Sequence, residues 1–488
     1  MKFKFIYIII LLSTVILSCE AKEQETQIRT HQELLQDFTD LRHGMFICYN
    51  IMSYGAQWGE ANYPYDSFNP QKLDCEQWAK AAVSANMKFG LLTTKHHEGF
   101  ALWPSKFNEY NVSKTPYKKD IVKQYVNAFR KHNLKIGIYY SIWDSTNNID
   151  EISPQAIKQI KGEITELLTN YGKIDYFVTD GWFWRMGHSE VSFIEIRNLI
   201  RKLQPECLLT DHTHLQSTFH VDIPYFEGPF GAFPKEDNTM ASALGHCPVK
   251  GNGWFWDEKS PNGLINSAEE IVEILSKCED RYCNFMLNCM PNRDGLLDPI
   301  YIDLLKEVGE LWIPDTTRAE LPLQALSVIH EVKPKVVKAT SGDSKNLFAG
   351  MMYGAKGYSD WVSDTSKTQE ITLDLGRIYS NINIINITGA HHCKPAPERS
   401  LKKGNITHCR LSSSTDGVKY NIINEYKWKA DGKMRSLTFK DQTTRYLKLE
   451  ILAHEGGNAI IAEMQVGSST EMSFADFMSN SNSEQSKK

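Results

Sequence analysis

The feature that most constrains the fold is a run of eight strand candidates that alternate with helical patterns between residues 31 and 317. The segments after Leu73 and from Asp120 carry apolar residues at helical spacing, and each opens with an aspartate suited to capping a helix N-terminus. Strands interleaved with helices in this way predict a (β/α)8 barrel, which we assign to residues 31–320. The strand candidates are residues 44–50, 89–93, 135–141, 176–179, 207–210, 223–226, 253–256 and 284–287.

A change of pattern after Pro314 indicates a second domain. From about residue 325 to 467, the helical period gives way to short alternating runs such as QEITLDLG, NINIINITG and RYLKLEIL. Turn signals such as Asp416-Gly417 separate these runs, a pattern typical of an antiparallel β-sandwich. The final segment, 468–488, is rich in Ser, Asn and Lys, and we expect it to be disordered.

The first thirty residues predict export and a lipid anchor. Two lysines precede an apolar run over residues 5–17, which is too short for a transmembrane helix and is typical of a signal peptide. The following Ile16-Leu17-Ser18-Cys19 resembles a bacterial lipobox, which implies cleavage before Cys19 and acylation of that cysteine. We therefore expect a signal peptide over 1–18, a lipidated tether over 19–30, and a periplasmic or cell-surface lipoprotein that contacts the membrane only through its lipid.

The composition excludes several classes of function. The formal net charge is −5 and the pI is near 6.3, so the chain offers no basic surface of the kind that binds nucleic acid. Of the ten cysteines, those other than Cys19 show neither a disulfide framework nor a zinc-finger spacing, and we expect them to be buried packing residues. The sequence shows no nucleotide-binding glycine motif, and we expect neither a cofactor nor a metal.

The polar residues that follow the strand candidates point to carbohydrate chemistry. In a (β/α)8 barrel the C-terminal ends of the strands meet at one face and build the active site. The second candidate ends in His96 and His97, which can donate hydrogen bonds to ligand hydroxyls or hold a metal. Two carboxylates among histidines and indoles are typical of glycoside hydrolysis. The other strand-end residues are Tyr140, Trp143, Asp144, Asp180, Asp211, His212, Glu227, Trp254, Trp256 and Asn288.

Several blocks of the chain resemble the α-L-fucosidases of glycoside hydrolase family 29. The longest is FNPQKLDCEQWAKAAVSANMKFGLLTTKHHEGFALWPSKFNEYNV from Phe68, and the others are RHGMF from Arg42, ELLTNYG from Glu166 and NFMLNCMPNRDGLL from Asn284. The phrase LWPSK resembles the subgroup that acts on branched α-1,3/1,4-linked fucosides. The C-terminal runs WVSDTSKTQEITLDLG, SSSTDG and TTRYLKLEIL resemble a discoidin-type carbohydrate-binding module.

This resemblance implies a retaining mechanism and assigns roles to individual residues. Asp180 matches the nucleophile at the end of the fourth strand, and Glu227 matches the general acid/base. His96 and His97 match a pair that binds the sugar. The other substrate-binding residues expected are Trp58, Tyr140 and Trp254, the last of these from its place at a strand end.

Three positions depart from the family pattern and define an altered subsite. Cys48 stands where the family has a histidine, Gln57 where it has a glutamate, and Val178 where it has a tryptophan. A cysteine cannot replace the hydrogen bonds of a histidine to ring hydroxyls. These changes leave the reaction type as the family has it and bear on which sugar the site accepts.

The leading interpretation is a retaining exo-glycosidase that releases terminal α-L-fucosyl residues from fucosylated glycans. One alternative is the same mechanism on a related α-glycoside, such as another L-sugar or a substituted fucoside. A second is a non-catalytic carbohydrate-binding lipoprotein on a decayed barrel. A metal hydrolase built on His96 and His97 is disfavoured, because adjacent residues at one strand end are expected to point to opposite sides.

Overall fold

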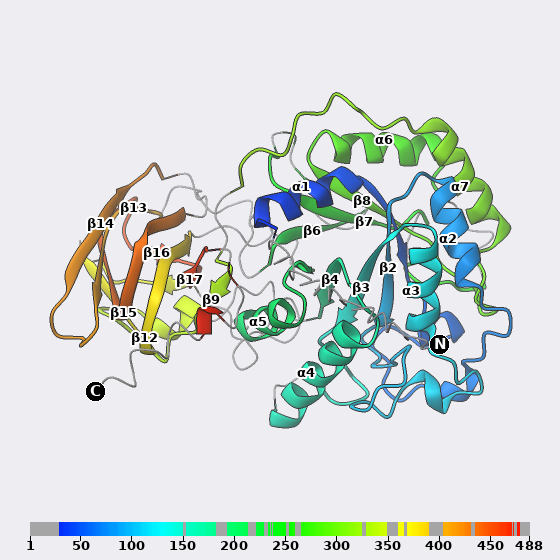
Figure 1. The fold of residues 1–488 in the computed structure, drawn as a ribbon, viewed down its shortest axis with the longest axis horizontal. Coiled ribbons are helices and arrows are strands. Elements are labelled where there is room, and N and C mark those ends of the chain that lie inside the picture. Colours follow the sequence, from blue (N-terminus) through cyan, green and yellow to red (C-terminus); the bar gives the residue numbers. More distant parts are fainter. Residues whose placement is uncertain are drawn as a thin grey trace, which may run out of the picture.

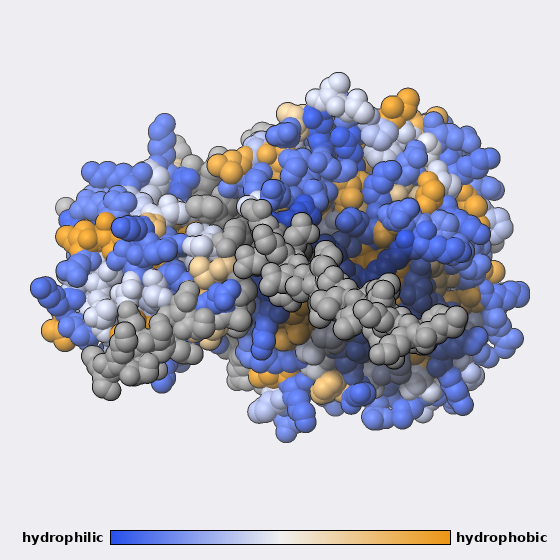
Figure 2. Space-filling view, in the orientation of Figure 1, coloured by the Kyte–Doolittle hydropathy of each residue, from blue (hydrophilic) through white to orange (hydrophobic). Residues whose placement is uncertain are grey.

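The computed structural model describes most of the chain between residues 29 and 478. The described ranges are 29–149, 153–181, 193–212, 221–228, 233–234, 236, 238–249, 253–258, 265–324, 328–348, 360–365, 368–389, 404–430, 435–470, 472 and 476–478. The predicted signal peptide and Cys19, the predicted site of acylation, lie outside these ranges. Within them, no helix is both long and apolar enough to cross a membrane. The face in Figure 2 is mostly hydrophilic, with apolar residues scattered over it.

Eight parallel strands close into a barrel, which confirms the predicted (β/α)8 fold. Each strand pairs with the next, and β1 also pairs with β8 to close the ring. Helices surround the barrel, which occupies the right of Figure 1. The strands are β1 (His43–Ile47), β2 (Phe89–Lys95), β3 (Lys135–Ser141), β4 (Tyr176–Asp180), β5 (Leu208–Asp211), β6 (Ile223–Gly228), β7 (Ser242–His246) and β8 (Cys283–Asn288). The helices are α1 (His31–Leu41), α2 (Cys75–Ser84), α3 (Ile121–Lys131), α4 (Pro154–Thr169), α5 (Phe193–Leu203), α6 (Ala268–Glu279) and α7 (Pro299–Leu311).

The predicted helix starts are confirmed by their caps. The Asp74 side chain accepts hydrogen bonds from two backbone N–H groups of the first turn of α2, and Asp120 accepts one from Lys123 in α3. α1 begins at a capping box in which Thr30 and Glu33 bond each other's backbone N–H groups. The ring of Phe38, on α1, packs on that of Tyr176 at the start of β4, with centroids 4.9 Å apart. α1 therefore covers the N-terminal end of the barrel, opposite the strand ends that carry the candidate site.

The seventh strand is not where the sequence predicted it. Residues 253–256 were expected to form it, whereas β7 is Ser242–His246 and the aromatic segment follows it. β7 reads SALGH and lacks the β-branched residues and the Phe, Tyr or Trp that signal a strand. Its small residues leave room for the large side chains of β6, because a Cβ atom added at Gly245 would lie 1.9 Å from the Tyr225 hydroxyl.

The C-terminal part consists of antiparallel sheets with a core of their own, matching the predicted β-sandwich. Seven strands form the larger sheet, in the order β14-β13-β15-β12-β17-β9 with β10 paired to β12, and β11 pairs with β16. Their core includes Trp361, Ile385 and Leu449. The strands are β9 (His330–Glu331), β10 (Val336–Ala339), β11 (Trp361–Val362), β12 (Gln369–Thr388), β13 (Ile406–Ser414), β14 (Asn421–Lys427), β15 (Arg435–His454), β16 (Ile460–Ile461) and β17 (Glu463–Ser468).

The expectation of a disordered tail from residue 468 is wrong for the part that the structure describes. Phe477 is 1% exposed, and its ring stacks on His330 with centroids 5.0 Å apart. Met472 and Met478 pack against the same core. Apolar side chains within a polar segment therefore dock on the sheet, because their burial is favourable.

A buried ion cluster joins these sheets to the barrel. Arg197 of α5 lies 3.0 Å from Asp222 and 3.7 Å from Glu331 of β9, and its side chain is 1% exposed. Arg201 also pairs with Asp222, at 2.7 Å. Burial opposes ionisation of Asp222, but the charges of both arginines lower its pKa well below the ordinary value. In Figure 1, α5 lies on the side of the barrel next to β9 and β17.

Candidate active site

Asp180 closes β4 at the mouth of the barrel and is held by groups from neighbouring strands. Its carboxyl is nearly buried and accepts a hydrogen bond of 2.6 Å from the hydroxyl of Tyr139 on β3. The backbone N–H of Gly181 donates to the other oxygen, and Nδ1 of His212 lies 3.3 Å from Oδ2. Gly181 has a φ of +68°, and an added Cβ would lie 2.6 Å from that of Trp143. The turn after Asp180 therefore requires glycine for close packing.

His96 and His97 lie side by side rather than on opposite sides as expected. Their ring centroids are 4.0 Å apart, because β2 ends at Lys95 and both residues belong to the turn that follows. Nε2 of His97 lies 3.8 Å from Oδ2 of Asp180. Burial, with a smaller contribution from His96, lowers the pKa of His97 to about 3, so its ring is neutral at neutral pH. His97 thus faces the carboxyl of Asp180 as an uncharged hydrogen-bonding group.

Glu98 is a site residue that our sequence reasoning did not single out, although it directly follows the histidine pair. Its buried carboxylate lies 2.9 Å from Nδ1 of His96 and accepts a 2.7 Å hydrogen bond from the backbone N–H of Gly59. Burial opposes its ionisation, but the nearby His96, His97 and the Gly59 N–H together lower its pKa below the ordinary value. Glu98 therefore orients His96 and ties its turn to the loop that carries Trp58.

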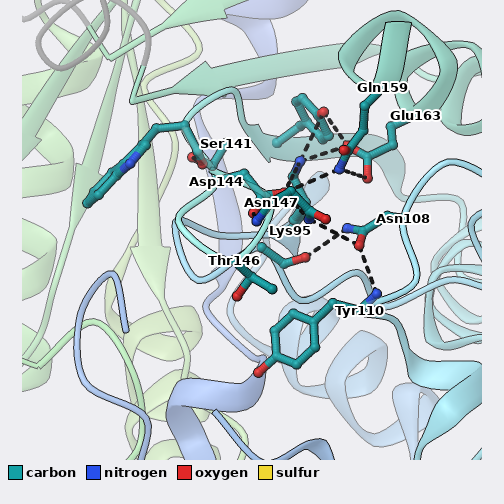
Figure 3. A network of polar contacts seen from close by, with 12 residues as sticks. Lys95, Asn108, Tyr110, Ser141, Asp144, Thr146, Asn147, Gln159 and Glu163 are labelled. Atoms are coloured by element: carbon teal, nitrogen blue, oxygen red, sulfur yellow. Dashed lines mark hydrogen bonds and ion pairs between the residues drawn. The ribbon is translucent and has the colours of Figure 1, made fainter. Parts of the chain in front are cut away.

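Tyr140 does not lie where we predicted a sugar ligand, and its neighbour Tyr139 is the tyrosine of β3 that reaches Asp180. Successive residues of a strand face opposite sides, and the hydroxyl of Tyr140 contacts Glu163 of α4 and Nζ of Lys95, away from the barrel interior. Lys95 also pairs with Glu163 at 2.7 Å and with Asp144 at 3.2 Å, all with fully buried side chains. Figure 3 shows this network between strand, helix and loop. This network lies outside the barrel interior and stabilises the turns that follow β2 and β3.

Aromatic side chains border the site. Trp58 is 55% exposed, and its ring lies 5.2 Å from that of His97 and 5.0 Å from that of Trp143. Trp254 packs on Phe46 with centroids 5.7 Å apart, and its carbonyl accepts a hydrogen bond from Asn288. An exposed indole next to a histidine is the arrangement that packs on the apolar face of a sugar ring.

Glu227 lies on β6 two residues beyond Tyr225, and hence on the same side of the strand. The ring of Tyr225 stacks on His212, with centroids 3.9 Å apart, and His212 in turn contacts Asp180. Burial raises the pKa of Tyr225, and the charges of Glu227 and Asp180 raise it further. Both predicted catalytic carboxyl groups thus lie near one ring inside the barrel.

The altered positions have unlike surroundings. Cys48 and Val178 are both 3% exposed and belong to the apolar cluster inside the barrel, with Phe46 and Tyr139. Burial raises the pKa of Cys48 well above its ordinary value, and the charge of Glu227 adds to this effect. Gln57 is exposed, and its side chain bonds the carbonyl of Gly55. Cys48 and Val178 therefore form an apolar wall inside the barrel, and Cys48 lies close enough to Glu227 for that charge to affect its thiol.

The cysteines have the packing role that the sequence predicted. Every cysteine in the described ranges is buried and unbridged. Those ranges also contain no group of three or more histidine, cysteine or acidic side chains placed to hold a metal ion. Cys19 and Cys393 lie outside the described residues.

A closed (β/α)8 barrel with two carboxyl groups, paired histidines and an exposed indole at its C-terminal face defines a hydrolase of the glycosidase class. The comparisons with known proteins agree. The family model "Alpha-L-fucosidase" matches residues 49–315, more than half of the chain. The chain therefore belongs to the α-L-fucosidase family of glycoside hydrolases.

Individual relatives are distant. α-L-Fucosidase 1 of Arabidopsis thaliana is 26% identical over 283 residues, which are 52% of this chain and 54% of the relative. Tissue α-L-fucosidase of Rattus norvegicus is 26% identical over 350 residues, 63% of this chain and 74% of the relative. The chain thus spans about half the length of the Arabidopsis relative. A glycoside hydrolase 29 family member from an unknown rumen bacterium has the same fold, with a TM-score of 0.52, 17% identity, and coverage of 89% of this chain and 98% of that one.

Proposed function

We propose that the protein hydrolyses terminal α-L-fucosyl residues with retention of configuration. The observation that carries the proposal is the setting of Asp180, a carboxyl at the end of β4 that Tyr139, Gly181 and His212 hold at the barrel mouth of an α-L-fucosidase family member. Fixed hydrogen-bond donors orient a carboxylate for attack and restrict its other conformations.

In this mechanism Asp180 attacks the anomeric carbon while Glu227 donates a proton to the departing glycosidic oxygen. Glu227 then removes a proton from water, which attacks the same carbon and releases the sugar from Asp180. His96 and His97 bind ring hydroxyls, and Trp58 packs on the sugar face. Between these two steps Glu227 is a carboxylate, because it has given its proton to the departing oxygen, and this is the form that accepts a proton from water.

Replacement of Asp180 by asparagine tests the proposal. Asp180→Asn should abolish turnover of a nitrophenyl α-L-fucoside while the circular dichroism spectrum and thermal unfolding stay close to those of the wild type. Asp211→Asn is the matched control and should keep its turnover. This buried carboxyl closes the next strand, β5, but accepts a 2.6 Å hydrogen bond from Thr179 and is not the attacking group of the proposal. Unchanged turnover in a folded Asp180→Asn protein would refute the assignment.

A second candidate substrate, a substituted fucoside or a related L-sugar, is favoured by the apolar wall of Cys48 and Val178. Such a wall suits a substituent better than a bare hydroxyl, which would lose hydrogen bonds there. Rates on nitrophenyl α-L-fucoside, α-L-galactoside and natural fucosylated glycans distinguish the candidates. Cys48→His should raise the rate on the simple fucoside. If Cys48→His does not raise the rate on nitrophenyl α-L-fucoside above that of the wild type, the argument for a substituted substrate fails.

We extend the proposal to the linkage that is cleaved, the C-terminal domain and the location of the protein. The LWPSK phrase supports preference for branched α-1,3/1,4-linked fucosides, and the C-terminal sheets support a discoidin-type carbohydrate-binding module. The lipobox-like segment supports acylation at Cys19 and a periplasmic or surface location. Metabolic labelling with radioactive palmitate should mark the wild type and not Cys19→Ala. Glycan binding without turnover by the full chain would instead indicate the non-catalytic alternative.

A further inference from the structure

We propose that Ser141 is a positioning residue that fixes His97 as the Nδ1–H tautomer, so that Nε2 accepts a hydrogen bond from a substrate hydroxyl. The inference rests on the proposed function for the identity of that hydroxyl, and on the structure alone for the tautomer. Ser141 is the last residue of β3 and is fully buried.

The number of hydrogens available to Ser141 settles the tautomer. Oγ of Ser141 lies 2.6 Å from the carbonyl oxygen of Trp143 and 2.7 Å from Nδ1 of His97. Two contacts this short each need a hydrogen, and a hydroxyl carries one. A carbonyl oxygen has none to donate, so the serine hydrogen points to Trp143. The hydrogen between Ser141 and His97 therefore belongs to Nδ1.

A neutral ring that is protonated at Nδ1 leaves a lone pair on Nε2. That atom lies 3.8 Å from Oδ2 of Asp180, so two acceptors face each other across the site. The other titratable groups near His97 are His96, Glu98 and His212. A hydroxyl of a bound sugar can donate to Nε2, whereas the opposite tautomer would point its N–H at Asp180 and could not accept.

The residues around Ser141 fix the position of its hydroxyl between Trp143 and His97. Gly181 leaves space beside it, because an added Cβ would lie 3.1 Å from Oγ. The loop after β3 is tied to the histidine turn, since both N–H and Oγ of Ser145 donate to the carbonyl of His97 at 2.9 Å. In Figure 3, Ser141 lies beside the loop that carries Asp144 and Asn147. The serine therefore has little freedom to turn its hydroxyl elsewhere.

Nitrogen NMR of the full chain tests the tautomer without substrate. The protein is labelled with [15N]histidine, and the His97 signals are assigned among fifteen histidines by their loss in His97→Gln. We expect a protonated Nδ1 and an unprotonated Nε2 in the wild type at neutral pH. In Ser141→Ala the pattern should shift toward protonated Nε2. Ser242→Ala, which removes a buried serine at the start of β7, should leave it unchanged.

Kinetics provide the second readout. Ser141→Ala should lower kcat/KM for the fucoside about tenfold, the worth of one hydrogen bond. A wild-type His97 protonated at Nε2, or an unchanged tautomer in folded Ser141→Ala, would overturn the inference. If Ser141→Ala fails to fold, the nitrogen NMR spectrum of the wild type still tests the tautomer of His97. A correct tautomer in a protein that cleaves no fucoside would contradict the proposed function and leave the tautomer assignment standing.

Discussion

Two adjacent tyrosines on β3 provide a sharp test of the site, because their hydroxyls lie on opposite sides of the strand and contact different groups. Tyr139→Phe removes the hydroxyl that donates to Asp180 at 2.6 Å, and Tyr140→Phe removes the one that contacts Glu163 and Lys95 behind the site. A hydrogen bond to a charged group is worth about 1.5–3 kcal/mol. We therefore expect Tyr139→Phe to lower kcat roughly 10- to 150-fold, since about 1.4 kcal/mol corresponds to a tenfold change in rate.

Tyr140→Phe should instead lower the stability of the protein and leave kcat almost unchanged. Its hydroxyl lies within a fully buried ion network, so its loss should lower the free energy of unfolding by about 1–3 kcal/mol and change kcat less than about twofold. Initial rates on a nitrophenyl α-L-fucoside and urea unfolding followed by circular dichroism measure both quantities on both variants. Equal losses of kcat in the two variants, or a larger loss in Tyr140→Phe, would refute the proposal that Tyr139 supports Asp180 in the reaction.

Three further outcomes are expected. Glu227→Ala should lose less activity on aryl glycosides with good leaving groups than on poor ones, and azide should partly restore turnover; equal losses would point to a different acid. Glu331→Gln should lower the free energy of unfolding by about 3–5 kcal/mol, because the buried Arg197 would lose one of its two anionic partners; a loss below about 1 kcal/mol in urea unfolding would contradict this. Burial lowers the pKa of His43 to about 3, below its unfolded value near 6.5, so its contribution to stability is complete above pH 6.5 and is lost as the pH falls toward 3; unfolding free energies measured from pH 7 to 4 should therefore fall less steeply in His43→Gln.

The sequence by itself determined the barrel and much of its rim. Helical periods that open on Asp74 and Asp120 alternate with apolar runs, and local capping and periodicity are readable without tertiary context. The end of a strand pattern made Asp180 one of several candidates, and the family resemblance singled it out among them. Helix, strand and turn signals of this kind depend on residues close in the chain.

Only the tertiary structure decided which side of each strand faces the substrate. A two-residue period shows that Tyr139 and Tyr140 face opposite ways, but closure of the barrel determines which one points inward. The pairing of Ser141 with Asp180 across β3 and β4, which brings His97 to Asp180, depends on the same closure. β7 shows the converse effect, because its small residues carry little strand signal and are accommodated by large neighbours on β6 that lie far away in the sequence. Its place in the barrel depends on contacts between strands, which no local pattern encodes.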